Sequence, residues 1–205
     1  MTITKIEEVL SLGKVIPVVT IHNMDDAKHV ADALYEGGIK VIEITLRTRC
    51  ALDGIKSLND HPIIVGAGTV TTTDRLKYAQ DAGAEFFVSP GFTAKLAEAG
   101  KDLPYLPGVE TISEIMRAMG HGYTNLKFYP AELSGGSKAV LNFKNLFPQA
   151  KFCPTGGIGD EKMRHYIKLS NVPCVGGSWL ASEDDIENQR WNKIKGAAKL
   201  VQMMR

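Results

Sequence analysis

The sequence contains few cysteines, no excess of charge of either sign and no long apolar run. Three cysteines in 205 residues are an odd number in a chain large enough to hold a core without disulfides, which is typical of a reducing compartment. We therefore expect a cytoplasmic protein. The N-terminus lacks the apolar segment of a signal peptide, and no run approaches the ~18 residues of a membrane-spanning helix. Neither secretion nor membrane contact is expected.

The charges are balanced. Lys and Arg number 24 against 23 Asp and Glu, and neither sign forms a block, so a nucleic-acid-binding stripe or a polybasic membrane anchor is not expected. Hydrophobic residues make up 44% and charged residues 23%, close to the averages of globular proteins. With roughly 150 residues per domain, the chain is expected to form one domain, 1–205, whose partner is a small molecule.

Short apolar runs recur every 19 to 26 residues, a spacing that leaves room for one helix between consecutive strands. The eight runs are Val15–Thr20, Val41–Leu46, Ile63–Val70, Phe86–Gly91, Tyr105–Val109, Asn125–Pro130, Lys151–Gly157 and Cys174–Leu180. Helical periodicity lies between them in Asp25–Glu36, Thr72–Asp81 and Ser113–Met119. Because the strands are continuously apolar, both sheet faces should be covered. We predict an α/β fold, a parallel eight-stranded (β/α)8 TIM barrel with an extra N-terminal helix; an open doubly wound sheet is the alternative.

Lys127 lies in the middle of the apolar run Asn-Leu-Lys-Phe-Tyr-Pro. A lysine is almost never buried without a partner, because burying an unpaired ammonium is costly. One interpretation is a structural pair with a core carboxylate. The other is a nucleophilic amine that attacks a ketone and forms a Schiff base.

The second strand supplies a matching pair of charges. A period of two places Glu43, Thr45 and Arg47 on one face of this strand. A Glu deep in the barrel fits a general acid/base, and an Arg nearer the mouth fits a carboxylate clamp. A structural Glu–Arg ion pair is the alternative.

Glycine-rich segments end two of the strands, namely Gly66-Ala-Gly68-Thr69 and Thr155-Gly156-Gly157-Ile-Gly159, and a third, Gly176-Gly177-Ser178, lies within the last strand. Glycines let backbone N–H groups approach an oxyanion, and the ends of strands 7 and 8 form the usual phosphate site of these barrels. They also serve as packing or turn devices. None of the segments matches a dinucleotide fingerprint or a P-loop.

The other reactive side chains have structural interpretations. The five histidines show no ligand spacing, so no metal site is expected. Cys153 and Cys174 lie in apolar strands and should behave as small hydrophobes. The acidic run Glu183-Asp184-Asp185 follows Ser182, as expected for the solvated start of the final helix.

Taken together, seven motifs in this order resemble the 2-keto-3-deoxy-6-phosphogluconate (KDPG) and 4-hydroxy-2-oxoglutarate (KHG) aldolase family. They span the chain from the first strand to the eighth. The motifs are Glu43–Thr48, Gly66–Val70, Val88–Gly91, Leu106–Val109, Lys127–Glu132, Pro154–Ile158 and Gly176–Trp179.

The resemblance implies a class I aldolase, a carbon–carbon lyase that needs no metal or other cofactor and assembles as a homotrimer. Its substrates would be phosphorylated keto acids cleaved to pyruvate and glyceraldehyde 3-phosphate, and 4-hydroxy-2-oxoglutarate cleaved to pyruvate and glyoxylate. Lys127 would be the Schiff-base lysine and Glu43 the general acid/base. The pyruvate part would be held by Arg47, Thr69, Pro90 and Thr155. The phosphate would be held by Gly156, Gly157, Gly177 and Ser178.

Two positions depart from the family pattern. Tyr129 stands where many members have Phe, which adds a hydroxyl group near the site. Some members carry an Arg at the end of the first strand, where this chain has Thr20-Ile-His22. Two other functions are compatible with the same residues: a sugar-phosphate isomerase or epimerase on the same barrel, and a non-catalytic sugar-phosphate sensor.

Overall fold

The computed structural model describes residues 3–203, in which short parallel strands alternate with helices. Each predicted apolar run contains a strand, but the strands are shorter than the runs. They are β1 (Val15–Val19), β2 (Val41–Thr45), β3 (Ile64–Gly68), β4 (Phe86–Val88), β5 (Tyr105–Leu106), β6 (Gly108–Val109), β7 (Asn125–Phe128), β8 (Lys151–Pro154) and β9 (Val175–Gly177).

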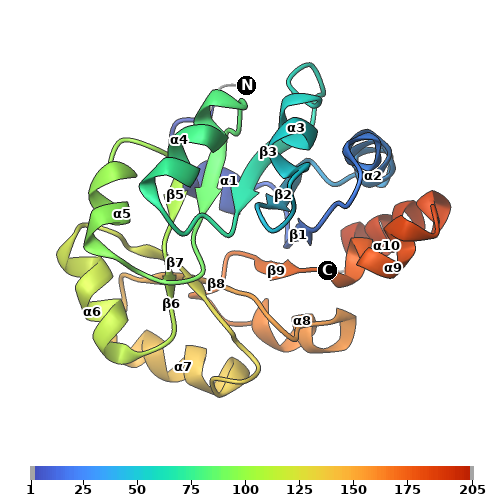
Figure 1. Cartoon of the computed structure of the whole chain (residues 1–205). Helices are drawn as coiled ribbons and strands as arrows, with labels where there is room; N and C mark the ends of the chain where they lie inside the picture. Colours follow the sequence, from blue (N-terminus) through green and yellow to red (C-terminus); the bar gives the residue numbers. More distant parts are fainter. Residues whose placement is uncertain (1–2, 204–205) are drawn as a thin grey trace.

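Helices surround the strands on the outside of the molecule, except the first, which lies near the middle of the view (Figure 1). They are α1 (Ile6–Leu10), α2 (Met24–Glu36), α3 (Ala51–Lys56), α4 (Thr73–Asp81), α5 (Ala94–Ala99), α6 (Ile112–Gly120), α7 (Gly136–Leu146), α8 (Asp160–Tyr166), α9 (Glu183–Glu187) and α10 (Trp191–Met203), with a 3₁₀ turn, η1, at Trp179–Ala181. The three helices predicted from periodicity correspond to α2, α4 and α6. Each begins at a capping side chain, since Asn23, Thr72 and Thr111 accept a hydrogen bond from a backbone N–H of the first turn.

The parallel α/β arrangement is confirmed, but the hydrogen bonding divides it into two sheets. One has the order β5-β4-β3-β2-β1-β9 and the other the order β6-β7-β8. The fifth predicted run is split at Pro107, which has no N–H to donate to a ladder. At the opposite side, a single bridge between Thr155 and Gly176 connects the two sheets. The pairing therefore does not show one continuous eight-stranded ladder.

Two apolar clusters cover the two faces of the strands. The larger one lies between strands and outer helices and includes Ile42, Ile44 and Phe128. In the smaller one, Ile6, Val9 and Leu10 of α1 pack against inward-facing strand residues. Full burial of side chains such as Val9 and Leu10 stabilises the fold by roughly 1.5–3 kcal/mol each. The extra helix thus fills one end of the interior and leaves the polar inner residues toward the other.

The C-terminal segment differs from the prediction at two points. β9 ends at Gly177, and η1 follows where the strand was expected to continue. The acidic run begins the five-residue helix α9 instead of the final helix, which is α10. Asp185 of this run is buried and pairs with Arg190 and Lys193, so the run is not simply a solvated helix start.

Within residues 3–203, no helix has both the length and the apolar character needed to cross a membrane. The three cysteines are unpaired thiols. Cys153 and Cys174 are buried with their sulfur atoms 3.8 Å apart.

Candidate active site

The interior between the two sheets holds one amine–carboxylate pair. Alternation along β2 sends Ile42 and Ile44 into the outer core and Glu43 inward. On β7, Lys127 lies between two outer-core residues and also points inward. Its Nζ atom donates a hydrogen bond to Glu43 Oε1 at 3.2 Å. Both residues are buried, with 6% and 4% of their surfaces exposed, so each charge depends on the other for compensation.

A glycine on β3 makes room for this pair. A side-chain Cβ at Gly68 would lie 2.1 Å from Glu43 Oε1, closer than any real contact allows. For the Gly66-Ala-Gly68 segment, the sequence left two roles open, anion binding and packing. The close approach of Glu43 favours the packing role for Gly68.

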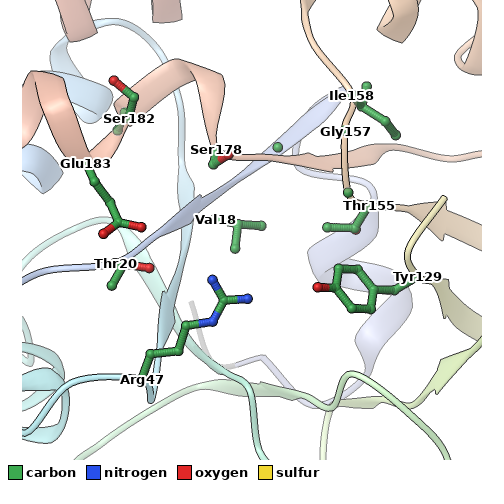
Figure 2. A pocket seen from close by; sticks show the side chains of 13 residues that line it. Val18, Thr20, Arg47, Tyr129, Thr155, Gly157, Ile158, Ser178, Ser182 and Glu183 are labelled. Atoms are coloured by element: carbon green, nitrogen blue, oxygen red, sulfur yellow. The ribbon is translucent and has the colours of Figure 1, made fainter. Parts of the chain in front are cut away.

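A cavity of about 300 Å³ opens at the carboxyl ends of β1, β2, β7, β8 and β9. Figure 2 shows the side chains that surround it. Six of the ten predicted site residues line it: Arg47, Thr155, Gly156, Gly157, Gly177 and Ser178. The other lining residues are Val18, Thr20, Tyr129, Ile158, Ala181, Ser182 and Glu183.

The Lys127–Glu43 pair lies next to this cavity. Lys127 Nζ is 5.6 Å from the centre of the Tyr129 ring, which forms part of the cavity wall. Glu43 is in register with Val18, another wall residue. The Thr155 hydroxyl donates to the carbonyl of Cys153, the residue in register with Lys127. These links place the buried pair against the wall of the open pocket, deeper in the strands.

The pocket wall offers several groups that can bind an anion. Arg47 forms no ion pair with any residue in 3–203. Gly156 and Gly157 have φ values of 102° and 75°, a left-handed conformation that favours glycine. In the same part of the chain their N–H groups donate no hydrogen bond. A guanidinium and free backbone N–H groups are typical partners of carboxylates and phosphates.

Thr69 and Pro90 are not brought to the pocket wall. Thr69 has a φ of 58°, and its carbonyl accepts a hydrogen bond from Arg75 at 3.4 Å. The backbone of Pro90 lies against Gly108, which is in register with Lys127. Both residues stand near the pair without lining the cavity.

Sequence reasoning missed the part of the wall that α9 contributes. Glu183 follows the helix cap Ser182, and its Oε2 atom lies 2.9 Å from Nε2 of His22. The hydrogen bond to Glu183 raises the pKa of His22. At the neighbouring strand end, Thr20 and Thr45 share a buried hydrogen bond of 2.9 Å. Thr20 and His22 belong to the segment where the sequence departs from the family pattern, whereas nothing in the sequence links Glu183 to the site.

No cluster of three or more His, Cys, Asp or Glu side chains suited to hold a metal ion occurs within 3–203. The reactive groups that the structure does bring together are an amine, a carboxylate and an open polar pocket beside them. On a parallel α/β fold, this arrangement is that of an enzyme active site at the carboxyl ends of the strands.

Comparison with known proteins gives the family. The family profile "KDPG and KHG aldolase" matches residues 6–197, and the chain belongs to this family. It is 46% identical over 197 residues to a 2-dehydro-3-deoxy-phosphogluconate aldolase of Pseudoalteromonas atlantica, covering 94% of this chain and 92% of the relative. It is 41% identical over 200 residues to the KHG/KDPG aldolase of Escherichia coli, covering 96% and 94%.

A solved structure supports the same family. The KDPG aldolase from Legionella pneumophila, with pyruvate captured as a covalent carbinolamine intermediate, aligns with a TM-score of 0.95 and 41% identity. The alignment covers 97% of this chain and 98% of that one. The similarity therefore extends over the whole fold, including the strands that carry the pair and the pocket.

Proposed function

We propose that the protein is a class I aldolase that cleaves 2-keto-3-deoxy-6-phosphogluconate to pyruvate and glyceraldehyde 3-phosphate. The same site cleaves 4-hydroxy-2-oxoglutarate to pyruvate and glyoxylate. The observation that carries the proposal is the buried Lys127–Glu43 pair, 3.2 Å apart, against the wall of an open pocket. Membership of the KDPG and KHG aldolase family supports it.

The reaction begins at Lys127. Its neutral amine adds to the C2 ketone and forms a carbinolamine, which loses water to give an iminium ion. Glu43 is close enough to take the proton that the amine must release, and it passes this proton to the carbinolamine hydroxyl, which leaves as water, so that Glu43 is again a carboxylate. The iminium then accepts the electron pair of the C3–C4 bond as this bond breaks, while Glu43 removes the C4 hydroxyl proton. The aldehyde leaves, the enamine is protonated at C3, and water releases pyruvate and the free lysine.

The remaining groups hold the two ends of the substrate. The Arg47 guanidinium binds the carboxylate next to the ketone and keeps the reacting carbons aligned with Lys127. Thr155 lines the same part, and Thr69 and Pro90 support it from beside the pocket. Gly156, Gly157, Gly177 and Ser178 bind the phosphate through backbone N–H and hydroxyl groups.

The proposal also covers the barrel, the cofactor requirement, the location and the assembly of the protein. The chain forms one domain, and the two sheets together make a closed (β/α)8 barrel joined at Pro107 and at the Thr155–Gly176 bridge. The enzyme uses no cofactor, since the Schiff base supplies the electron sink, and it acts in the cytoplasm. It assembles as a homotrimer, and the exposed Ile112 and Met116 on α6 are consistent with a subunit contact.

Trapping with borohydride tests the function. Borohydride added with pyruvate reduces the iminium to a stable secondary amine, so we expect irreversible inactivation and a carboxyethyl group on Lys127 in the peptide mass spectrum. Lys127→Met should not be labelled. Lys193→Met, which removes an exposed lysine on α10, should be labelled like the wild type.

The same experiment separates the other two functions. An isomerase or epimerase that uses Lys127 only as a charge would not be labelled. A sensor would bind the sugar phosphate without releasing pyruvate in a coupled assay. Either result would overturn the aldolase assignment.

A further inference from the structure

Glu183 is the one acidic side chain on the wall of the pocket formed by the described residues, and Arg47 is the one cationic side chain there. Figure 2 shows the Glu183 carboxylate directed toward Thr20, on the side of the cavity away from Gly157. The cavity that should accept a phosphate therefore also carries a negative charge. The proposed chemistry does not use this carboxylate.

His22 holds the carboxylate in place. The imidazole comes from the segment after β1, and its Nε2 atom lies 2.9 Å from Glu183 Oε2. Both side chains are about half exposed, at 52% and 54%. The second carboxylate oxygen, Oε1, makes no hydrogen bond with any residue in 3–203, so it can accept one from a ligand.

The charge matters because the cavity is small. Groups on opposite walls of a 300 Å³ cavity lie within the Debye length of ~10 Å at 0.1 M salt, so they are only partly screened from each other. A phosphate dianion bound at the glycines is repelled by Glu183. A substrate tail that ends in a hydroxyl group avoids this repulsion, and when it lies on the Glu183 side of the cavity it can donate a hydrogen bond to the carboxylate.

We propose that Glu183, positioned by His22, is a specificity-determining residue that lowers the preference for a phosphate over a hydroxyl group at the end of the substrate. The protein accordingly has a further activity: aldol cleavage of unphosphorylated 2-keto-3-deoxy sugar acids to pyruvate and a neutral polyhydroxylated aldehyde. The bonds broken and formed are those of the phosphorylated reaction. This inference rests on the proposed aldolase function and concerns the other end of the same site.

Two variants of Glu183 separate its charge from its hydrogen bond. We would measure kcat/KM for 2-keto-3-deoxy-6-phosphogluconate and for 2-keto-3-deoxygluconate in the wild type, Glu183→Gln and Glu183→Ala. Both variants should raise kcat/KM for the phosphorylated substrate about three- to fivefold, the size of a partly screened charge interaction. Glu183→Ala should also lower kcat/KM for the unphosphorylated substrate about fivefold, because the acceptor is lost. Glu183→Gln keeps a carbonyl acceptor and should change that value little.

Two further variants serve as controls. Glu187→Gln removes the same charge from the same helix, but Glu187 does not line the cavity, so the ratio of the two kcat/KM values should stay at the wild-type value. His22→Gln removes the imidazole, which offsets the charge of Glu183 when it is protonated. It should raise KM for the phosphorylated substrate about threefold with kcat unchanged, opposite in sign to the Glu183 variants.

The possible outcomes are distinct. A wild-type protein that cleaves neither substrate would overturn the aldolase function and this inference with it. A protein that cleaves the phosphorylated substrate, but whose substrate ratio is the same in the wild type and both Glu183 variants, would overturn the role of Glu183 alone. A shift of the ratio in Glu187→Gln as large as in Glu183→Gln would likewise overturn it, because the effect would then come from the net charge of α9.

Discussion

Two buried carboxylates in this molecule are held in different ways. Asp185, at the start of α9, accepts hydrogen bonds from the Ser182 hydroxyl at 2.8 Å, from Arg190 at 3.1 Å and from Lys193 at 2.7 Å. Glu43, inside the strands, makes one side-chain hydrogen bond, to Lys127. Both residues are only 4% exposed, so burial alone does not distinguish a structural acid from a catalytic one.

The number of hydrogen-bond partners distinguishes the two carboxylates. Asp185 has both oxygens occupied, and the hydrogen bond from Lys193 is the main cause that lowers its pKa. The second oxygen of Glu43 has no partner. In residues 3–203 the only fully enclosed side-chain polar atom without a partner is Asn171 Oδ1, so this Glu43 oxygen must border open space. A saturated carboxylate stabilises the fold, whereas one with a free oxygen facing a cavity can still accept a proton from a substrate.

The largest expected effect is on catalysis. Glu43→Gln should lower kcat/KM for pyruvate release about 10²- to 10⁴-fold, because an amide cannot exchange a proton with the C4 hydroxyl or with Lys127. Asp185→Asn should leave kcat/KM within about twofold of the wild type, since this group does not touch the pocket. A coupled pyruvate assay measures both. Equal losses in the two variants would remove the functional distinction between the two acids.

The second effect is on stability. Lys127→Met leaves Glu43 buried without its cation, which should lower the free energy of unfolding by roughly 3 kcal/mol. Lys193→Met leaves Asp185 with Arg190 and Ser182, and Lys193 is an exposed partner, so its loss should be under about 1 kcal/mol. Urea denaturation followed by circular dichroism compares the two. A larger loss of unfolding free energy in Lys193→Met than in Lys127→Met would contradict this prediction.

The smallest expected effect is the pH dependence of the stability that Asp185 contributes. Because the folded pKa of Asp185 lies below its ordinary value of 3.8, the carboxylate stabilises the protein at all pH values above 3.8, and this contribution is lost as the pH falls through the folded pKa. Asp185→Asn should therefore be less stable than the wild type at pH 7 by roughly 1–3 kcal/mol. The difference should stay constant down to about pH 4 and shrink below it. Denaturation midpoints measured from pH 7 to pH 3 give the curve, and a difference that grows in acid would contradict the assigned cause.

Much of the fold could be predicted because it depends on local patterns. The spacing of the apolar runs, which leaves room for one helix and two loops, located every strand, and helical periodicity located α2, α4 and α6 to within one or two residues. Alternation along β2 also predicted that Glu43 points to the same side as Thr45. These features depend on backbone geometry, which neighbouring residues in the sequence determine.

The site was predicted in part. Lys127 stood out because a lysine inside an apolar strand needs a partner, and the motif order pointed to one family. The details that the sequence could not predict concern contacts between distant segments. Glu43 packs against Gly68, and the strand ladder breaks at Pro107. The acidic run after Ser182 contains both a buried residue that anchors α9, Asp185, and a residue of the pocket wall, Glu183.

The sequence by itself determined the class of fold, the strand that carries each reactive side chain and the family. Only the tertiary structure decided that Lys127 and Glu43, 84 positions apart, meet at hydrogen-bonding distance, and that Glu183 reaches the pocket beside His22, 161 positions away in the chain. The physical reason is that period and propensity act over a few residues. Distances between side chains are decided instead by the way parallel strands and their loops pack around a common interior.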